Sequence, residues 1–259
     1  MPIHLTDMEY KAVRFYIGDT AGMEQDGFWN DPKAYVVLNS LFYPGIATEQ
    51  ARAAEGKRLN PEIIADSRRL ELFYQALFSA FRKCRAERPL ISYRVERFAD
   101  YQVMEQNQKT ISFTSTSANG FLKAYQDRIG IALLKFRIPA KTPCLIMHEI
   151  LPDYAKQEEA EILLPPGLTL QIAKKQITEQ EMQICDAAGQ PPQISCCVSV
   201  QLPEIRKKDD FSELHENGNI AGIRIFQKLQ SGVFPDEQDI SCYSAWKQSL
   251  TARMISYLT

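Results

Sequence analysis

The chain has 259 residues, of which 45% are hydrophobic and 24% are charged, and its formal net charge is −2. A chain of this length and composition can bury a substantial hydrophobic core, as one large domain or two small ones. The nearly balanced charge gives no overall basic field, and no window reaches the roughly 18 apolar residues of a membrane span. We therefore expect neither a nucleic-acid partner nor a membrane association.

The helical part of the sequence begins near Thr6, a candidate N-cap with Glu9 at capping-box spacing from it. Val13 and Tyr16 continue the helical period, and Gly18 is a natural C-terminal stop. These signals predict a first helix between Thr6 and Gly18.

Two further helices are predicted before the first strand. One follows Pro32 and ends near Pro44 and Gly45, and the other starts after Pro61 and continues through ELFYQALFSAFRKC. In the latter, apolar side chains recur at intervals of three and four residues, which predicts one buried face. These side chains are Leu70, Phe73, Leu77, Phe78 and Phe81.

The period then changes from helical to alternating. The segment LISYRVERF predicts a strand with Ile91, Tyr93 and Val95 on one face and Ser92, Arg94 and Glu96 on the other. Further strands are predicted in TISFTSTS, GIALLKFRIP and CLIMHEIL, and two more around the Pro-Pro-Gly turn of AEILLPPGLTLQIAKKQ. The segment PPQISCCVSVQLPEI predicts one long strand or a strand pair.

Helices that precede a run of strands indicate an α+β fold. The polar segment EIRKKDDFSELHENGNIAG is predicted to be loop or short helix, and YSAWKQSLTARMISYLT a terminal amphipathic helix. We expect a single domain over 1–259, with a helical lobe at 1–90, a β core at 91–205 and a C-terminal extension at 206–259. That extension could recognise a target, or it could simply complete the fold.

Metal-binding patterns are missing from the sequence. None of the six cysteines forms a C-x-x-C pair, and the adjacent Cys196 and Cys197 would point to opposite sides of a strand. The three histidines, His4, His148 and His215, are scattered. We expect reduced thiols in a cytosolic setting and no bound metal.

Two glutamates stand where a predicted strand begins, in AKQEEAEILLPPG. Alternation along a strand would place Glu159 and Glu161 on one face, about 7 Å apart, while Glu158 falls in the loop. Two such carboxylates could be a solvated strand end. Alternatively, they could stabilise a cationic transition state between them.

An arginine and a run of hydroxyls precede these acids. Arg94 lies within a predicted strand, where its guanidinium needs an anion, either a phosphate or the carboxylate of Glu96. The hydroxyls of SFTSTS could reflect β-propensity alone, or one of them could orient a carboxylate or a ribose.

In chain order these segments resemble a known family. Tyr93-Arg94 on a first strand, then Phe-x-Ser-Thr-Ser ending at Ser117, then Glu-x-Glu leading into ILLPPG, resemble the mono-ADP-ribosyltransferases with the Arg-Ser-Glu signature. That family includes clostridial-type binary toxins and many bacterial effectors. The resemblance covers roughly residues 5–175. It implies a mixed, mainly antiparallel β-sandwich of the ADP-ribosyltransferase type after an N-terminal helical lobe.

The resemblance implies a binding site for NAD as co-substrate, without metal. Arg94 would bind the pyrophosphate, and the backbone of Val95 would hold the nicotinamide amide, although relatives often have glycine at that position. Thr116 would hold the strand and the nicotinamide ribose. Tyr125 would cover the nicotinamide and Arg128 would contact phosphate, with an ordinary helix face as the alternative for both.

The resemblance also implies catalytic residues. Ser115 would brace Glu161, which would hydrogen-bond the 2′-hydroxyl of the nicotinamide ribose and stabilise the sugar cation as nicotinamide leaves. Glu159 would orient the acceptor and help to deprotonate it. Tyr154, in the loop before the two glutamates, would recognise the protein substrate.

The implied function is transfer of ADP-ribose from NAD to a side chain of a target protein, by default an arginine, with threonine or another residue also open. The alternatives are an NAD glycohydrolase, a catalytically inactive binding module with the same fold, and a strand-rich domain without an NAD site. The N-terminus, MPIHLTDMEY, does not resemble a secretory signal. We expect a cytoplasmic protein, or an effector delivered into a host cell by a specialised secretion system and acting on a host protein.

Overall fold

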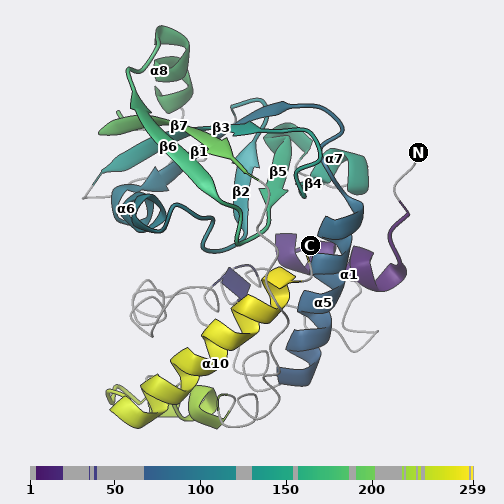
Figure 1. Ribbon diagram of the computed structural model, residues 1–259, viewed down its shortest axis with the longest axis vertical. Coiled ribbons are helices and arrows are strands. Elements are labelled where there is room, and N and C mark those ends of the chain that lie inside the picture. The colour runs from purple at the N-terminus through teal and green to yellow at the C-terminus, as the bar shows by residue number, and fades with distance from the viewer. Residues whose placement is uncertain are drawn as a thin grey trace. The chain divides into compact units, whose positions relative to one another are not determined.

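The computed structural model describes most of the chain, in several stretches. The described residues are 4–19, 35, 38, 39, 67–120, 130–153, 157–186, 191–201, 218, 220–225, 227, 228, 231–256 and 258. Contacts divide the chain into two compact units (Figure 1). One contains Phe81–Glu204, and the other contains His4–Ala80 and Ile205–Thr259.

The second unit is mainly helical in its described part, and its first helix begins and ends as the sequence predicts. Helix α1 (Asp7–Ile17) carries the predicted capping box, because the Thr6 side chain accepts from the Glu9 amide while the Glu9 carboxylate accepts from the Thr6 amide. Gly18 ends the helix in the left-handed conformation, with φ 78°. Glu9 is also buried against α5 (Ser67–Lys83), where it accepts a hydrogen bond of 2.6 Å from the Ser79 hydroxyl.

Helix α5 and the C-terminal helix α10 (Glu237–Ser256) belong to the same unit as α1, together with shorter described helical stretches at 218–228. The predicted apolar face of α5 is buried at Phe73, Leu77 and Phe78, and Phe73 meets Phe15 of α1 edge to face at 4.7 Å. The predicted helix between Pro32 and Gly45 lies almost entirely outside the described residues.

Helix α10 confirms the predicted terminal helix and contributes to the interior of its unit. Trp246 is 1% exposed and Leu250 is 4% exposed. Arg253 forms an ion pair with Glu71 of α5. These contacts place Trp246 and Leu250 in the hydrophobic core of the unit, and the role of residues 206–259 in target recognition stays a prediction.

The first unit is built on a seven-stranded sheet with the order β4-β5-β2-β1-β3-β7-β6. All neighbouring strands are antiparallel except β3 and β7, so the α+β class and the mixed, mainly antiparallel sheet are confirmed. The strands are β1 (Leu90–Arg97), β2 (Thr114–Ser117), β3 (Ile131–Ile138), β4 (Leu145–Ile146), β5 (Glu161–Leu164), β6 (Leu170–Lys175) and β7 (Ile194–Val200).

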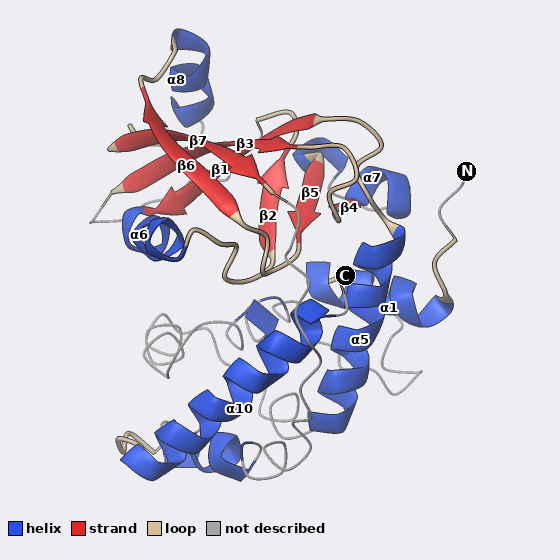
Figure 2. Cartoon of the chain, in the orientation of Figure 1, coloured by secondary structure: helices blue, strands red, loops and turns tan. Residues whose placement is uncertain are grey.

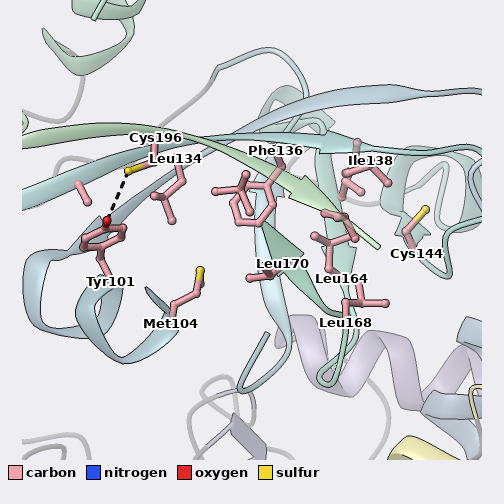
Figure 3. Close-up of a cluster of buried hydrophobic side chains, with 14 of the residues drawn as sticks. Tyr101, Met104, Leu134, Phe136, Ile138, Cys144, Leu164, Leu168, Leu170 and Cys196 are labelled. Carbon is pink, nitrogen blue, oxygen red and sulfur yellow. Dashed lines mark hydrogen bonds between the residues drawn. The ribbon is translucent and has the colours of Figure 1, made fainter. Parts of the chain in front are cut away.

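The sheet has two parts that meet at β1 and β2. These strands pair at the single position Tyr93–Ser117, whereas β1 and β3 pair along their whole lengths. In Figure 2, β2 and β5 run steeply across the direction of β3 and β7. The apolar faces of the two parts nevertheless share one hydrophobic core, since Ile162 and Leu164 of β5 join Phe136 of β3 in the same buried cluster (Figure 3).

Strands β5 and β6 follow one another in sequence but lie far apart in the strand order. The Pro-Pro-Gly segment does not close a hairpin, because β5 pairs with β2 and β4 while β6 pairs with β7. Thr110 fixes this crossing segment, because its hydroxyl donates to the Pro165 carbonyl at 2.8 Å and accepts from the Leu168 amide at 2.9 Å.

Three helices of this unit were not predicted from the sequence. Residues 144–151 were predicted as a strand, but only Leu145–Ile146 is extended and α7 (Met147–Ile150) follows. Met147 and Ile150 are buried, whereas His148 and Glu149 are half exposed. The buried residues are thus three apart, as in a helix, but a segment this short and apolar does not distinguish helix from strand. Helices α6 (Phe98–Asn107) and α8 (Glu179–Asp186) were not predicted.

Helix α6 is attached to the sheet by a buried tyrosine. The Tyr101 hydroxyl donates to Glu105 at 2.6 Å and accepts from the Cys196 thiol of β7 at 3.5 Å (Figure 3). Burial, followed by the hydrogen bond to Glu105, raises the pKa of Tyr101 well above its ordinary value. The phenol therefore stays neutral and serves as an anchor.

Candidate active site

Strand pairing brings Ser115 and Glu161 together. Glu161 opens β5 directly opposite Ser117 of β2, and Ser115 lies two residues along β2 on the same face, so Ser115 and Glu161 are diagonal neighbours. The Ser115 Oγ donates a hydrogen bond of 2.5 Å to Oε1 of Glu161. Glu161 is only 9% exposed, and a carboxylate at that depth needs such a donor.

Arg94 joins this pair from the neighbouring strand. Its Nη1 donates a hydrogen bond of 2.8 Å to the backbone carbonyl of Ser115. Two hydrogen bonds therefore connect Arg94, Ser115 and Glu161, at the place where β1 and β2 pair at only one position. The structure brings these three candidate residues together, although they are far apart in sequence.

Arg94 also forms the ion pair that was considered as the alternative to phosphate binding. Its Nε donates to Oε2 of Glu96, two residues along β1 on the same face. The Glu96 side chain is 10% exposed and that of Arg94 is 29% exposed, so the arginine is the partner that reaches solvent. The carboxylate holds the guanidinium in place, and the Arg94 side chain as a whole remains partly exposed.

Thr116 lies on the other side of β2. Its hydroxyl is buried and donates to the Ile162 carbonyl at 2.8 Å, and alternation along the strand places it opposite Ser115 and Glu161. This contact holds β2 against β5.

Glu159 does not share a strand face with Glu161, so that prediction was wrong. Strand β5 begins at Glu161, and Glu159 ends a 3₁₀ turn, Gln157–Glu159. Between them Ala160 has φ 43°, which breaks the alternation on which the prediction depended. The turn remains tied to the segment that follows β2, because the Ala118 amide donates to the Ala160 carbonyl at 3.0 Å.

The other candidate residues are less well placed by the structure. Val95 pairs with Leu133 of β3 and packs against it together with Tyr93. Tyr125, Arg128 and Tyr154 lie outside the described residues.

Two polar residues at this site were not given roles from the sequence. The Ser117 hydroxyl donates to Oδ1 of Asn119 at 2.7 Å, and the Asn119 amide donates to the Glu158 carbonyl at 2.6 Å. The Asn119-Gly120 pair directly after a strand is a turn signal, and it could have pointed to Asn119 as a local anchor.

Among the described residues, no group of three or more histidine, cysteine or acidic side chains could hold a metal ion. No described helix is both long and apolar enough to cross a membrane.

Comparison with protein-family models and with curated proteins finds no match. Solved structures are similar at low identity. The C3 exoenzyme of Clostridium limosum is 15% identical, with 77% of this chain and 88% of that chain covered, and a TM-score of 0.41. C3stau2 from S. aureus, solved with NAD, is 12% identical, with 78% and 90% covered and a TM-score of 0.41.

A third similar structure is that of BECa, an ADP-ribosylating toxin from a binary enterotoxin of C. perfringens, solved with NADH. It is 12% identical, with 76% of this chain and 44% of that chain covered, and a TM-score of 0.44. At these identities and TM-scores, the likeness assigns neither an activity nor a residue role to this chain.

Proposed function

We propose that this protein is a mono-ADP-ribosyltransferase that cleaves NAD and transfers ADP-ribose to a side chain of a target protein. The observation that carries the proposal is the short hydrogen bond from Ser115 to Glu161, with Arg94 bound to the carbonyl of the same serine. The same three residues are those of the Arg-Ser-Glu signature that the sequence resembles.

The reaction breaks the bond between C1′ of the nicotinamide ribose and the nicotinamide nitrogen. Positive charge then develops on the sugar, and the Glu161 carboxylate stabilises it and accepts a hydrogen bond from the 2′-hydroxyl. Ser115 keeps that carboxylate fixed before the reaction, so little free energy is lost in reorienting it. The buried position of Glu161 strengthens this interaction, since water screens it less.

Arg94 is the proposed ligand of the NAD pyrophosphate. A guanidinium matches two phosphate oxygens at once, and Glu96 and the Ser115 carbonyl fix its orientation. The backbone of Val95 next to it would hold the nicotinamide amide. Thr116 contributes through its bond to the Ile162 carbonyl, which keeps β2 and β5 in register beneath Ser115 and Glu161.

The acceptor attacks C1′ and loses a proton, which Glu159 takes and passes to solvent. The products are nicotinamide, the ADP-ribosylated side chain and a proton. Arginine is the default acceptor because the motif has the Glu-x-Glu form, and we propose a host protein as the target, reached by delivery of an effector. Tyr125, Arg128 and Tyr154 keep their proposed roles at nicotinamide, phosphate and acceptor.

The test is incubation of the purified protein with NAD labelled in its adenosine part and a eukaryotic lysate, with nicotinamide release and label in protein measured together. We expect both, and Glu161→Gln should abolish both, because it removes the negative charge but keeps the shape of the side chain. Glu179→Gln, at an exposed position on α8, is the matched control and should retain both.

Three results would contradict the proposal. Release of nicotinamide without label in protein would indicate an NAD glycohydrolase. Equal background release by the unaltered protein and by Glu161→Gln would indicate an inactive module. No change in melting temperature on titration with NAD would indicate that the chain has no NAD site.

A further inference from the structure

Beyond Ser117, the contacts between the two strand ends continue for one more backbone hydrogen bond and then through a side chain. The last backbone contact runs from the Ala118 amide to the Ala160 carbonyl, at 3.0 Å. The next contact toward the 3₁₀ turn is made by Asn119, whose side-chain amide donates to the Glu158 carbonyl at 2.6 Å. A side chain thus takes the place of the backbone where the strand ends.

The Asn119 amide is held in one orientation. Its oxygen accepts from the Ser117 hydroxyl at 2.7 Å, while its nitrogen donates to Glu158. Because the two ends of an amide group differ, one as acceptor and the other as donor, these contacts exclude the flipped arrangement.

The two contacts made by the residues that follow β2 lie on either side of Glu159. Asn119 holds the peptide group that joins Glu158 to Glu159, and Ala118 holds the carbonyl of Ala160. Ala160, between Glu159 and the strand, has φ 43°, a conformation that a residue with a side chain rarely adopts unless its surroundings impose it. The turn therefore depends on these contacts for its shape.

We propose that Asn119, oriented by Ser117, is a positioning residue that sets Glu159 relative to Glu161 for the transfer step. Alternate hydroxyls on one face of β2 then serve the two acids separately: Ser115 contacts Glu161 directly, and Ser117 acts on Glu159 through Asn119. This inference rests on the proposed function, and it assigns Asn119 to the acceptor step rather than to cleavage of NAD.

The test compares Asn119→Ala, Asn119→Asp and Ser117→Ala in full-length protein. The aspartate variant keeps the size and the oxygen that Ser117 contacts, but it loses the donor to Glu158. We expect each variant to lower ADP-ribose transfer about tenfold, with NAD hydrolysis lowered less than about twofold and KM for NAD unchanged. Asn107→Ala is the matched control, because Asn107 also donates from its amide to a backbone carbonyl, that of Val103 at 2.8 Å.

A double variant tests whether Asn119 acts through Glu159. Adding Asn119→Ala to Glu159→Ala should cause no further loss of transfer, since the side chain being positioned is already gone. Amide hydrogen exchange at Ala118, whose N–H donates to Ala160, should be faster in Asn119→Ala than in the unaltered protein, with or without NAD.

The outcomes separate this inference from the proposed function. The positioning role would be overturned by unchanged transfer in Asn119→Ala, by a further loss in the double variant, or by unchanged exchange at Ala118. The proposed function would still stand in each case if Glu161→Gln abolished nicotinamide release and transfer. Absence of nicotinamide release from the unaltered protein would overturn the proposed function, and with it the assignment to the acceptor step.

Discussion

Ser115 and Glu161 lie diagonally across the β2–β5 pair, and the serine hydroxyl donates a hydrogen bond of 2.5 Å to the glutamate carboxylate. The glutamate is nearly buried at the first residue of its strand, and Arg94 binds the carbonyl of the same serine. Cleavage of NAD at this site would depend on a carboxylate that is fixed before the substrate arrives.

The first prediction concerns Ser115→Ala. Without the hydroxyl, Glu161 loses the donor that orients it, so nicotinamide release should fall about tenfold to a hundredfold, mainly in kcat. Steady-state assays of NAD hydrolysis measure this. Ser231→Ala is the control, because its exposed hydroxyl also donates to a nearby carbonyl, that of Gln227 at 2.9 Å. A change confined to KM would argue against the orienting role.

The second prediction concerns Arg94 and Glu96. Arg94→Ala should weaken NAD binding about tenfold or more, as seen by calorimetry, because a charge-assisted contact with the pyrophosphate is lost. Glu96→Gln should weaken binding less, since the guanidinium remains but is oriented less firmly. Arg137→Ala, at an exposed position of β3, should bind NAD normally. Equal NAD affinity in Arg94→Ala and the unaltered protein would refute the pyrophosphate assignment.

The third prediction separates the two glutamates. Glu159→Ala should lose transfer to protein but retain much of the NAD hydrolysis, because a proton acceptor for the incoming side chain is gone while Glu161 remains. Its exposed neighbour provides the control, and Glu158→Ala should retain transfer because only the backbone carbonyl of Glu158 takes part in the turn. Parallel loss of both activities in Glu159→Ala would contradict separate roles.

The fourth prediction is a pH dependence of stability. Burial alone would raise the pKa of Glu181, which is 2% exposed, but hydrogen bonds from Lys175 and from the Thr178 amide outweigh burial and lower this pKa. The unfolded chain then takes up the proton at a higher pH than the folded chain. The contribution of Glu181 to stability should be complete above about pH 4.5 and lost as the pH falls further.

Urea unfolding of Glu181→Gln checks this. The variant should be less stable than the unaltered protein by about 1–3 kcal/mol at neutral pH, because Lys175 loses a buried partner. The difference should shrink as the pH falls below about 4.5. Glu179→Gln on the same helix is exposed and should change stability by less than about 0.5 kcal/mol. A difference that persists unchanged at low pH would show that the carboxylate charge is not the cause.

The fifth prediction concerns thiol reactivity. Burial, with a smaller effect from Cys84, raises the pKa of Cys144 to about 12, and burial also raises the pKa of Cys196. Thiol alkylation at pH 8, followed by peptide mass spectrometry, should modify the half-buried Cys197 and Cys242 before the buried Cys84, Cys144 and Cys196. Cys144 should react only after unfolding, and labelling of Cys144 as fast as Cys197 would contradict its burial.

The sequence predicted those features that depend on local rules. The capping box at Thr6 and the stop at Gly18 each involve residues within one turn, and both are present. The strands β1, β3 and β7 have enough alternating or β-branched residues to be recognised alone. The order of the motifs also predicted that Arg94, Ser115 and Glu161 belong to one site.

Features that depend on tertiary contacts could not be predicted in this way. The position of Glu159 follows from the backbone of Ala160 and from the bond that Asn119 makes to Glu158, and neither follows from strand periodicity. Helix α6 shows too little contrast between its faces, because its buried residues are Tyr101 and Met104 within a polar sequence. The ion pair of Arg94 with Glu96 was one of two alternatives that the sequence left open, because both residues lie on one face of the strand.

The left-handed residue at Ala160 also bears on how such a protein could diversify. Because the chain bends at Ala160, residues inserted or exchanged before Glu159 in the sequence need not disturb strand β5, which begins at Glu161. Under the proposed function, selection could therefore change which protein is modified while the geometry around Glu161 stays constant.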